Sequence, residues 1–171
     1  DAFVSWHQDG TYFGLSPAEH VTAWVALSES NERSGCVEVV PGSHKAGQLR
    51  HTVGDDPNNM LRTGQKIDVP DDAPRALLPV PAGHFSLHHT NLLHNSRANR
   101  ADDRRIGLGV SYIPTHVKCS SRTRLTALLV RGTDEYGHFD HEAAPSGDRE
   151  TDRARHADAM ARWNASRKEQ T

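Results

Sequence analysis

Residues 105–112 read Arg-Ile-Gly-Leu-Gly-Val-Ser-Tyr and alternate strictly between two kinds of residue. The alternation predicts a β-strand with two unlike faces, because successive side chains of a strand point to opposite sides. One face is apolar and needs a second layer to pack against; it holds Ile106, Leu108, Val110 and Tyr112. The other face leaves space beside it and holds Arg105, Gly107, Gly109 and Ser111.

Short strands separated by turn residues continue on both sides of this stretch. We expect strands at residues 3–8, 21–27, 36–40, 76–80, 85–89 and 92–95, and a strand or a short helix at 126–130. Residues 44–74 are polar and rich in Gly, Asp, Asn and Pro, which predicts a long loop. A helix is expected only at 149–168, with a weak apolar stripe of Ala154, Ala157, Met160, Ala161 and Trp163. The pattern is typical of an all-β barrel or sandwich.

Composition excludes several classes of protein. The chain has 171 residues, which fits one domain, and a formal net charge of −2, which argues against nucleic acid or a membrane surface as partner. No apolar run approaches the roughly 18 residues of a membrane span. Two cysteines, Cys36 and Cys119, cannot form a disulfide scaffold, so we expect free thiols and a cytoplasmic protein. The twelve histidines make a metal site worth seeking.

The clearest candidate for a metal site begins in Trp6-His7-Gln8-Asp9-Gly10. On a strand, His7 and Asp9 share one face and can offer a nitrogen and an oxygen to one ion. A third ligand must come from a distant strand, and His94 is favoured because turn residues follow it at 95–103. A hairpin centred near residues 99–100 would place Arg105 opposite His94.

Two histidines and one carboxylate with open positions opposite are the ligand set of non-haem Fe(II) oxygenases, and zinc accepts the same ligands. A guanidinium in a cavity binds a small dicarboxylate through two parallel hydrogen bonds, so Arg105 favours an Fe(II) enzyme that uses a 2-oxo acid. A salt-bridged surface arginine beside glycines at a bulge fits the same spacing.

An ordered set of motifs resembles the phytanoyl-CoA dioxygenase family. The set comprises Trp6-His7-Gln8-Asp9, Tyr12-Phe13, Ala23-Trp24, residues 34–45 (S-G-C-V-E-V-V-P-G-S-H-K), Leu93-His94-Asn95-Ser96 and Asp103-Arg104-Arg105. The resemblance covers residues 6 to about 114 and continues more weakly to about 145. It implies an all-β double-stranded β-helix (jelly-roll, cupin-like) and an oxygenase that uses Fe(II), 2-oxoglutarate and O₂.

Carried over by position, His7, Asp9 and His94 match the iron ligands, and Arg105 matches the arginine that pairs the far carboxylate of 2-oxoglutarate. Ser96 and Trp24 match positions that line this cosubstrate, although Trp24 also fits a core position. His88 and His89 match no ligand, and we expect them on opposite faces of a strand with one contact behind the ligands. We expect the 41–44 turn (Pro-Gly-Ser-His) to be structural, and Tyr12, Phe13 and the 44–74 loop to border the substrate.

The resemblance implies a hydroxylase that oxidises a C–H bond of a small molecule and releases succinate and CO₂ from 2-oxoglutarate. The carboxylate of Asp9 favours oxygenation over halogenation, because halogenating relatives have a small residue there. Desaturation, cyclisation or epimerisation at the same iron site stays open, as do a binding module without catalysis and a zinc hydrolase on a cupin-like barrel. No oligomeric state is predicted.

The division expected is an oxygenase core at residues 1–145 and a charged helical extension at 146–171. The sequence opens inside a predicted strand, and members of the family that it resembles have a substantial region before the H-x-D motif. Strands that line a pocket must bury their other face. We therefore expect a longer protein whose earlier segment covers these apolar faces, and poor solubility for the 171 residues alone.

Overall fold

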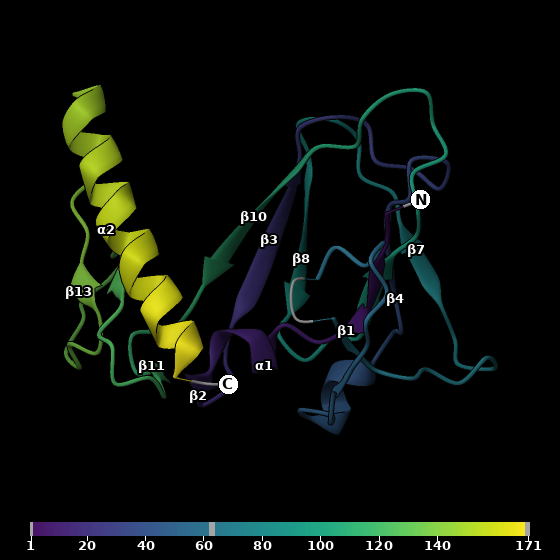
Figure 1. Cartoon of the computed structure of the whole chain (residues 1–171), viewed down its shortest axis with the longest axis horizontal. Coiled ribbons are helices and arrows are strands. Elements are labelled where there is room, and N and C mark those ends of the chain that lie inside the picture. The colour runs from purple at the N-terminus through teal and green to yellow at the C-terminus, as the bar shows by residue number, and fades with distance from the viewer. Residues whose placement is uncertain (1, 62–63, 170–171) are drawn as a thin grey trace. The chain divides into compact units, whose positions relative to one another are not determined.

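The computed structural model describes residues 2–61 and 64–169 (Figure 1). The chain divides into two compact units. The first comprises Asp1–Tyr12 and His20–Tyr112, and the second comprises Phe13–Glu19 and Ile113–Thr171. The C-terminal helix therefore groups with residues 113–145 rather than forming a unit of its own.

Two antiparallel sheets build the first unit. One has the order β1-β9-β4-β7, from strands Val4–His7, His94–Ser96, Val37–Val39 and Ala76–Leu78. The other has the order β10-β3-β8, from strands Gly107–Tyr112, Val21–Ala26 and Phe85–His89, which lie side by side in Figure 1. A small pair, β5 (Thr52–Val53) and β6 (Gln65–Lys66), forms inside the predicted 44–74 loop. This architecture confirms the all-β jelly-roll prediction.

The β10-β3-β8 sheet has the two unlike faces that the alternation predicts. In its register, Leu108 pairs with Val25 and Val25 with Phe85, so apolar side chains form one face. This face is largely exposed: Phe85 is 60%, Leu87 61% and Leu108 50% accessible. The opposite face carries one large residue, Trp24, among small and polar ones. Its rows are Gly109, Trp24 and Ser86, then Ser111, Thr22 and His88.

The predicted hairpin between His94 and Arg105 is wrong. Strand β9 pairs with β1 and β4, whereas β10 pairs with β3, so the two strands belong to different sheets. The turn residues 97–103 have hydrogen bonds among themselves, from Asn99 Nδ2 to the Asp103 carbonyl, and also bond to other segments. Arg97 turns back to the buried Glu38 with two hydrogen bonds of 3.2 and 2.7 Å, and the Arg100 backbone N–H donates to the carbonyl of Arg33.

Several short elements escaped the sequence prediction. They are α1 (Gly10–Phe13), β2 (Leu15–Ser16), the 3₁₀ helix Ser43–Ala46, β11 (Lys118–Cys119) and β13 (Asp140–His141). Elements of two to four residues give no periodic pattern to read. The ambiguous stretch at 126–130 contains a strand, β12 (Thr126–Ala127), which pairs in parallel with β13.

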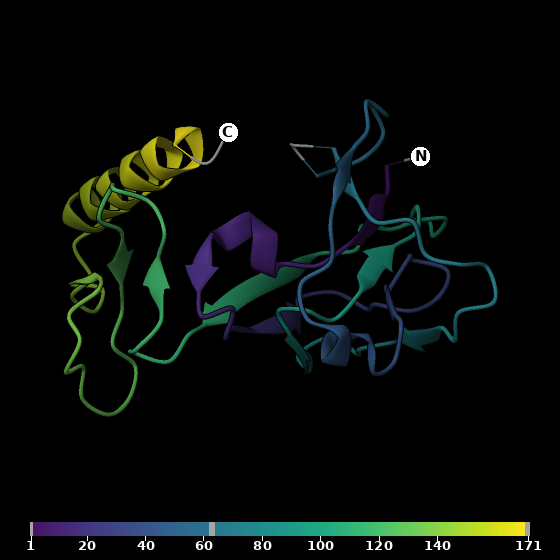
Figure 2. The same cartoon turned by 90° about the horizontal axis from the view of Figure 1, so that it is seen from below.

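In the second unit, β2 pairs with β11, and helix α2 spans Arg149–Lys168, the range predicted (Figure 2). Asp148 caps its first turn by accepting from the N–H groups of Glu150 and Thr151. The predicted apolar stripe is wrong for Ala154, Ala157, Met160 and Ala161, which are exposed. Polar contacts hold the helix instead, together with the packing of Trp163 on Phe13 at 5.7 Å.

No helix in the described ranges combines the length and the apolar character needed to cross a membrane. Both cysteines are free thiols, with Cys36 buried and Cys119 half-buried.

Candidate metal centre

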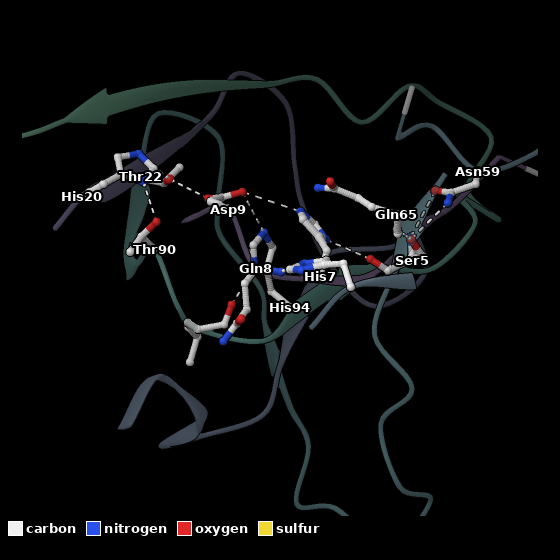
Figure 3. A network of polar contacts seen from close by, with 12 residues as sticks. Ser5, His7, Gln8, Asp9, His20, Thr22, Asn59, Gln65, Thr90 and His94 are labelled. Carbon is white, nitrogen blue, oxygen red and sulfur yellow. Dashed lines mark hydrogen bonds and ion pairs between the residues drawn. The ribbon is translucent and has the colours of Figure 1, made fainter. Parts of the chain in front are cut away.

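Strand pairing brings His7 and His94 together, because they are partners in the β1–β9 ladder. Asp9 follows β1 by two residues and places its Oδ1 3.6 Å from His7 Nε2 and 3.7 Å from His94 Nε2 (Figure 3). Among the described residues these three form the one cluster whose ligand atoms all lie within 4.8 Å of one another. The structure therefore unites the three predicted ligands.

Backbone carbonyls orient both imidazole rings. The Nδ1 of His7 lies 2.9 Å from the carbonyl of Ser5, and the Nδ1 of His94 lies 2.9 Å from the carbonyl of Leu92. A carbonyl only accepts, so each Nδ1 carries the proton and each Nε2 keeps its lone pair. Ser5 is itself held, since its hydroxyl donates to the Gln65 carbonyl at 2.7 Å. The arrangement suits a divalent metal, which binds the unprotonated nitrogen.

Burial and neighbouring groups prepare these side chains for a metal. Burial opposes ionisation of Asp9, yet its interactions with the neighbouring His7 and His94 rings and the hydrogen bond from Thr22 hold its pKa well below the usual range. Burial lowers the pKa of His94 to about 3. At neutral pH the site thus combines an anionic oxygen with a neutral imidazole, the forms in which both groups bind metals.

Behind Asp9 lies a polar network that sequence reasoning missed. Thr22 Oγ1 donates to Asp9 Oδ2 at 2.8 Å, and His20 Nε2 lies 3.3 Å from the same hydroxyl. His20 Nδ1 in turn lies 3.1 Å from the Thr90 hydroxyl. His20 and Thr22 stand two residues apart at the predicted 21–27 strand, so their shared face was readable from the sequence, but nothing there linked it to Asp9.

Gln8, between two of the ligands, is fully buried and ties the site to two other segments. Its Nε2 donates to the carbonyls of Gly47 and Asn91 at 2.9 and 2.7 Å. Its Oε1 accepts from the backbone N–H of Leu49 at 2.7 Å. The 44–74 segment is therefore fastened to the ligand strand. The predicted 41–44 turn is also structural, since Ser43 Oγ accepts from the Leu93 N–H at 2.8 Å.

Of the predicted cosubstrate residues, Trp24 lies on β3 and Ser96 on β9, and Arg105 lies two residues before β10. The Arg105 guanidinium lies over the Trp24 ring, 5.4 Å from its centroid, and burial lowers the pKa of Arg105. Within the described part of the chain Arg105 forms no ion pair. A Cβ on Gly107 would meet the Trp24 ring at 2.1 Å, whereas one on Gly109 would meet nothing within 4 Å. The Trp24 ring therefore fills the space beside Gly107, whereas the space beside Gly109 is open.

Ser96 is buried at 6% exposure and follows His94 by two residues on β9. His88 and His89 lie on opposite faces of β8, as predicted: His88 is buried with its ring 5.2 Å from that of His94, and His89 is exposed. His88 Nδ1 has no hydrogen-bond partner among the described residues. Phe13, predicted to border the substrate, packs on Trp163 within the second unit.

Comparison with known proteins identifies the family. The sequence model of the family "Phytanoyl-CoA dioxygenase (PhyH)" matches residues 1–107. The chain belongs to the phytanoyl-CoA dioxygenase family. The matched range includes the three candidate ligands and Arg105.

Two curated relatives of this PhyH-family chain match over somewhat less than two thirds of its length. A probable alpha-ketoglutarate-dependent hypophosphite dioxygenase of Stutzerimonas stutzeri is 30% identical over 112 residues, which are 64% of this chain and 39% of that protein. A probable phytanoyl-CoA dioxygenase of Caenorhabditis elegans is 32% identical over 108 residues, 62% of this chain and 35% of that protein. The chain thus spans well under half the length of these relatives.

Solved structures extend the similarity to the whole PhyH-family chain. Apo ThoJ, described as a non-heme monooxygenase, aligns with a TM-score of 0.84 and 29% identity over 99% of this chain and 62% of its own. The epimerase SnoN, solved with Fe³⁺, alpha ketoglutarate and nogalamycin RO, aligns with a TM-score of 0.55 and 28% identity over 86% of this chain and 56% of its own.

Proposed function

We propose that the chain forms the core of an Fe(II)- and 2-oxoglutarate-dependent oxygenase that hydroxylates a C–H bond of a small molecule, with release of succinate and CO₂. One observation carries the proposal: His7, Asp9 and His94 offer three ligand atoms to one point, with both histidines held in the tautomer that binds a metal. A set of two histidines and one carboxylate leaves other coordination positions open for small ligands.

The chain's own residues would bind and orient the reactants. His7 Nε2, His94 Nε2 and Asp9 Oδ1 would hold Fe(II). When bound, Fe(II) supplies the activation of O₂ that is coupled to oxidative decarboxylation of the 2-oxo acid. The protein's contribution would be to fix these three ligands in position.

Arg105 would bind the far carboxylate of 2-oxoglutarate, with Trp24 and Ser96 lining the same space. A half-buried guanidinium without an ion pair in the described ranges is a ready partner for an anionic ligand. The Trp24 ring holds the cation from one side, and the open space at Gly109 adjoins it on the same sheet face.

Epimerisation or cyclisation at the same iron site is the second candidate. SnoN is named as an epimerase and SnoK as a carbocyclase, and both align with this chain at 28% identity. Neither reaction changes the ligand set, so the chemistry at the substrate must be measured.

The decisive experiment is anaerobic loading of the protein with Fe(II), followed by 2-oxoglutarate, O₂ and a library of small molecules. Succinate formed in step with a product that has gained one oxygen supports hydroxylation, and succinate with an isomerised or cyclised product supports the second candidate. Ester or amide hydrolysis with Zn(II), without succinate under any condition, would replace both with a zinc hydrolase. Metal binding without any turnover would leave a binding module.

A further inference from the structure

The carboxylate of Asp9 has two oxygens in different surroundings. Oδ1 faces the Nε2 atoms of His7 and His94 at 3.6 and 3.7 Å, whereas Oδ2 accepts a hydrogen bond of 2.8 Å from Thr22 (Figure 3). The Thr22 hydroxyl therefore holds the carboxylate in one rotation, with a single oxygen directed toward the two histidines.

Three buried residues, Thr22, His20 and Thr90, form a network with a fixed direction. An ionised carboxylate only accepts hydrogen bonds, so the Thr22 hydroxyl must donate its proton to Asp9. Its oxygen then accepts from His20 Nε2 at 3.3 Å, and His20 Nδ1 accepts from the Thr90 hydroxyl at 3.1 Å. His20 thus carries its proton on Nε2, the opposite tautomer to the one inferred for His7 and His94.

Burial makes this network rigid. Thr90 is fully buried, His20 is 2% exposed and Thr22 is 9% exposed. The backbone N–H of Thr90 also donates to the His20 carbonyl at 3.0 Å, which fixes the two segments to each other. Neighbours this well packed cannot reorient when a metal arrives, so the carboxylate rotation is set before binding.

We propose that Thr22 and His20 are positioning residues that restrict Asp9 to binding the metal through Oδ1 alone. A carboxylate without the Thr22 donor can turn about its Cβ–Cγ bond and place both oxygens on the metal. The second oxygen would then occupy a coordination position that the cosubstrate or O₂ needs. The proposal rests on the proposed function only for the identity of the metal.

The test compares Thr22→Val, which keeps the shape of the side chain and removes the hydroxyl, with Thr22→Ser, which keeps the hydroxyl. Thr52→Val, at an exposed position on β5, is the matched control. Each protein is loaded with Co(II) in place of Fe(II). Isotope-edited infrared spectra of ¹³C-aspartate-labelled protein give the separation of the two carboxylate stretches, which is wide for one bound oxygen and narrow for two.

We expect a narrow separation and a Co(II) affinity about 10–100-fold weaker in Thr22→Val, because losing a partner of a metal ligand typically has this effect. Thr22→Ser and Thr52→Val should match the wild type. A wild-type separation and affinity in Thr22→Val would overturn the proposal. His20→Phe removes the donor to Thr22 and the acceptor for the Thr90 hydroxyl but leaves the hydrogen bond from Thr22 to Asp9, so it gives the same test with a smaller expected change if Thr22→Val does not fold.

The outcome separates this proposal from the proposed function. A changed carboxylate mode in Thr22→Val, in a protein that never turns over 2-oxoglutarate, would support the positioning role and refute the oxygenase. Normal 2-oxoglutarate turnover with an unchanged carboxylate mode in Thr22→Val would refute the positioning role alone.

Discussion

His7 and His94 are cross-strand partners, and each ring is fixed by the carbonyl two residues before it in its own strand. The two Nε2 atoms that we propose as metal ligands are thereby directed by backbone rather than by other side chains. A site built on strand register requires no rearrangement of the chain to accept an ion.

Substitution His94→Ala should abolish metal binding and turnover. The variant loses one of three ligand atoms, so its Fe(II) affinity should fall by more than the roughly 10–100-fold typical of losing a residue that only supports a ligand. The measurement is competition with a chromogenic chelator under anaerobic conditions. His84→Ala, at an exposed position before β8, is the control, and near-normal affinity in His94→Ala would refute the ligand assignment.

Substitution Arg105→Ala should weaken 2-oxoglutarate binding while Fe(II) binding is kept. Truncating one partner of a buried charge pair costs about 2–5 kcal/mol, which corresponds to a rise of roughly thirtyfold or more in the apparent constant for 2-oxoglutarate. Titration of the Fe(II)-loaded protein with 2-oxoglutarate measures it. The neighbouring exposed Arg104→Ala should leave the constant unchanged; the reverse result would assign the carboxylate to Arg104.

The two glycines of β10 should respond differently to the same substitution. In Gly107→Ala the new methyl group meets the Trp24 ring, which must move and take the Arg105 guanidinium with it. We expect a loss of about 1–3 kcal/mol of stability, as for other overpacked sites, and weaker 2-oxoglutarate binding. Gly109→Ala should preserve stability, because its methyl group enters open space. Equal unfolding midpoints in urea for both variants would contradict this.

The metal-free protein should lose stability as the pH falls below neutrality. Burial lowers the pKa of four histidines from the usual 6.5: His20, His51, His88 and His94. In the unfolded chain these rings bind protons more readily than in the folded protein. Their contribution to the free energy of unfolding is therefore complete above about pH 6.5. It is lost as the pH falls toward 3, the pKa of His94 in the folded protein.

Urea unfolding at several pH values between 7.5 and 4.5 measures this dependence. His88→Gln should make the free energy of unfolding fall less steeply with decreasing pH, because it removes one of the four histidines whose pKa is lowered. His156→Gln, on the exposed surface of α2, should leave the decline as in the wild type. A free energy of unfolding that stays constant from pH 7 to 5 would show that these rings are not buried in solution.

Alternation within single strands carried most of the fold prediction. The β10 face pattern follows from local periodicity, and the structure has it. The helix at 149–168 also forms, although most of its predicted apolar stripe is exposed. Asp9 lies beyond the end of β1 and still joins His7 in one cluster. The partner of each strand is a long-range property, and here the assumption that neighbours in sequence pair in space failed for β9 and β10. Arg97 and Glu38, far apart in sequence, decide where that segment turns.

The sequence predicts those site residues whose type and spacing are characteristic of a metal site. It does not predict residues that join the site only through long-range packing. A histidine and an aspartate at i and i+2 indicate a possible metal site. Thr22 contributes to the site only because β3 places its hydroxyl next to Oδ2 of Asp9. Gln8 likewise reads as a spacer between two ligands, yet its amide joins three segments.

The side-chain amide of Gln8 also protects a backbone N–H, that of Leu49, from hydrogen exchange. The Leu49 N–H exchanges with solvent deuterium when its hydrogen bond to Gln8 Oε1 opens, and Gln8 is fully buried between His7 and Asp9 in the chain. An ion that bridges those two residues therefore slows exchange at Leu49, although Leu49 touches no metal. One amide proton outside the coordination sphere becomes a reporter of whether the centre is occupied.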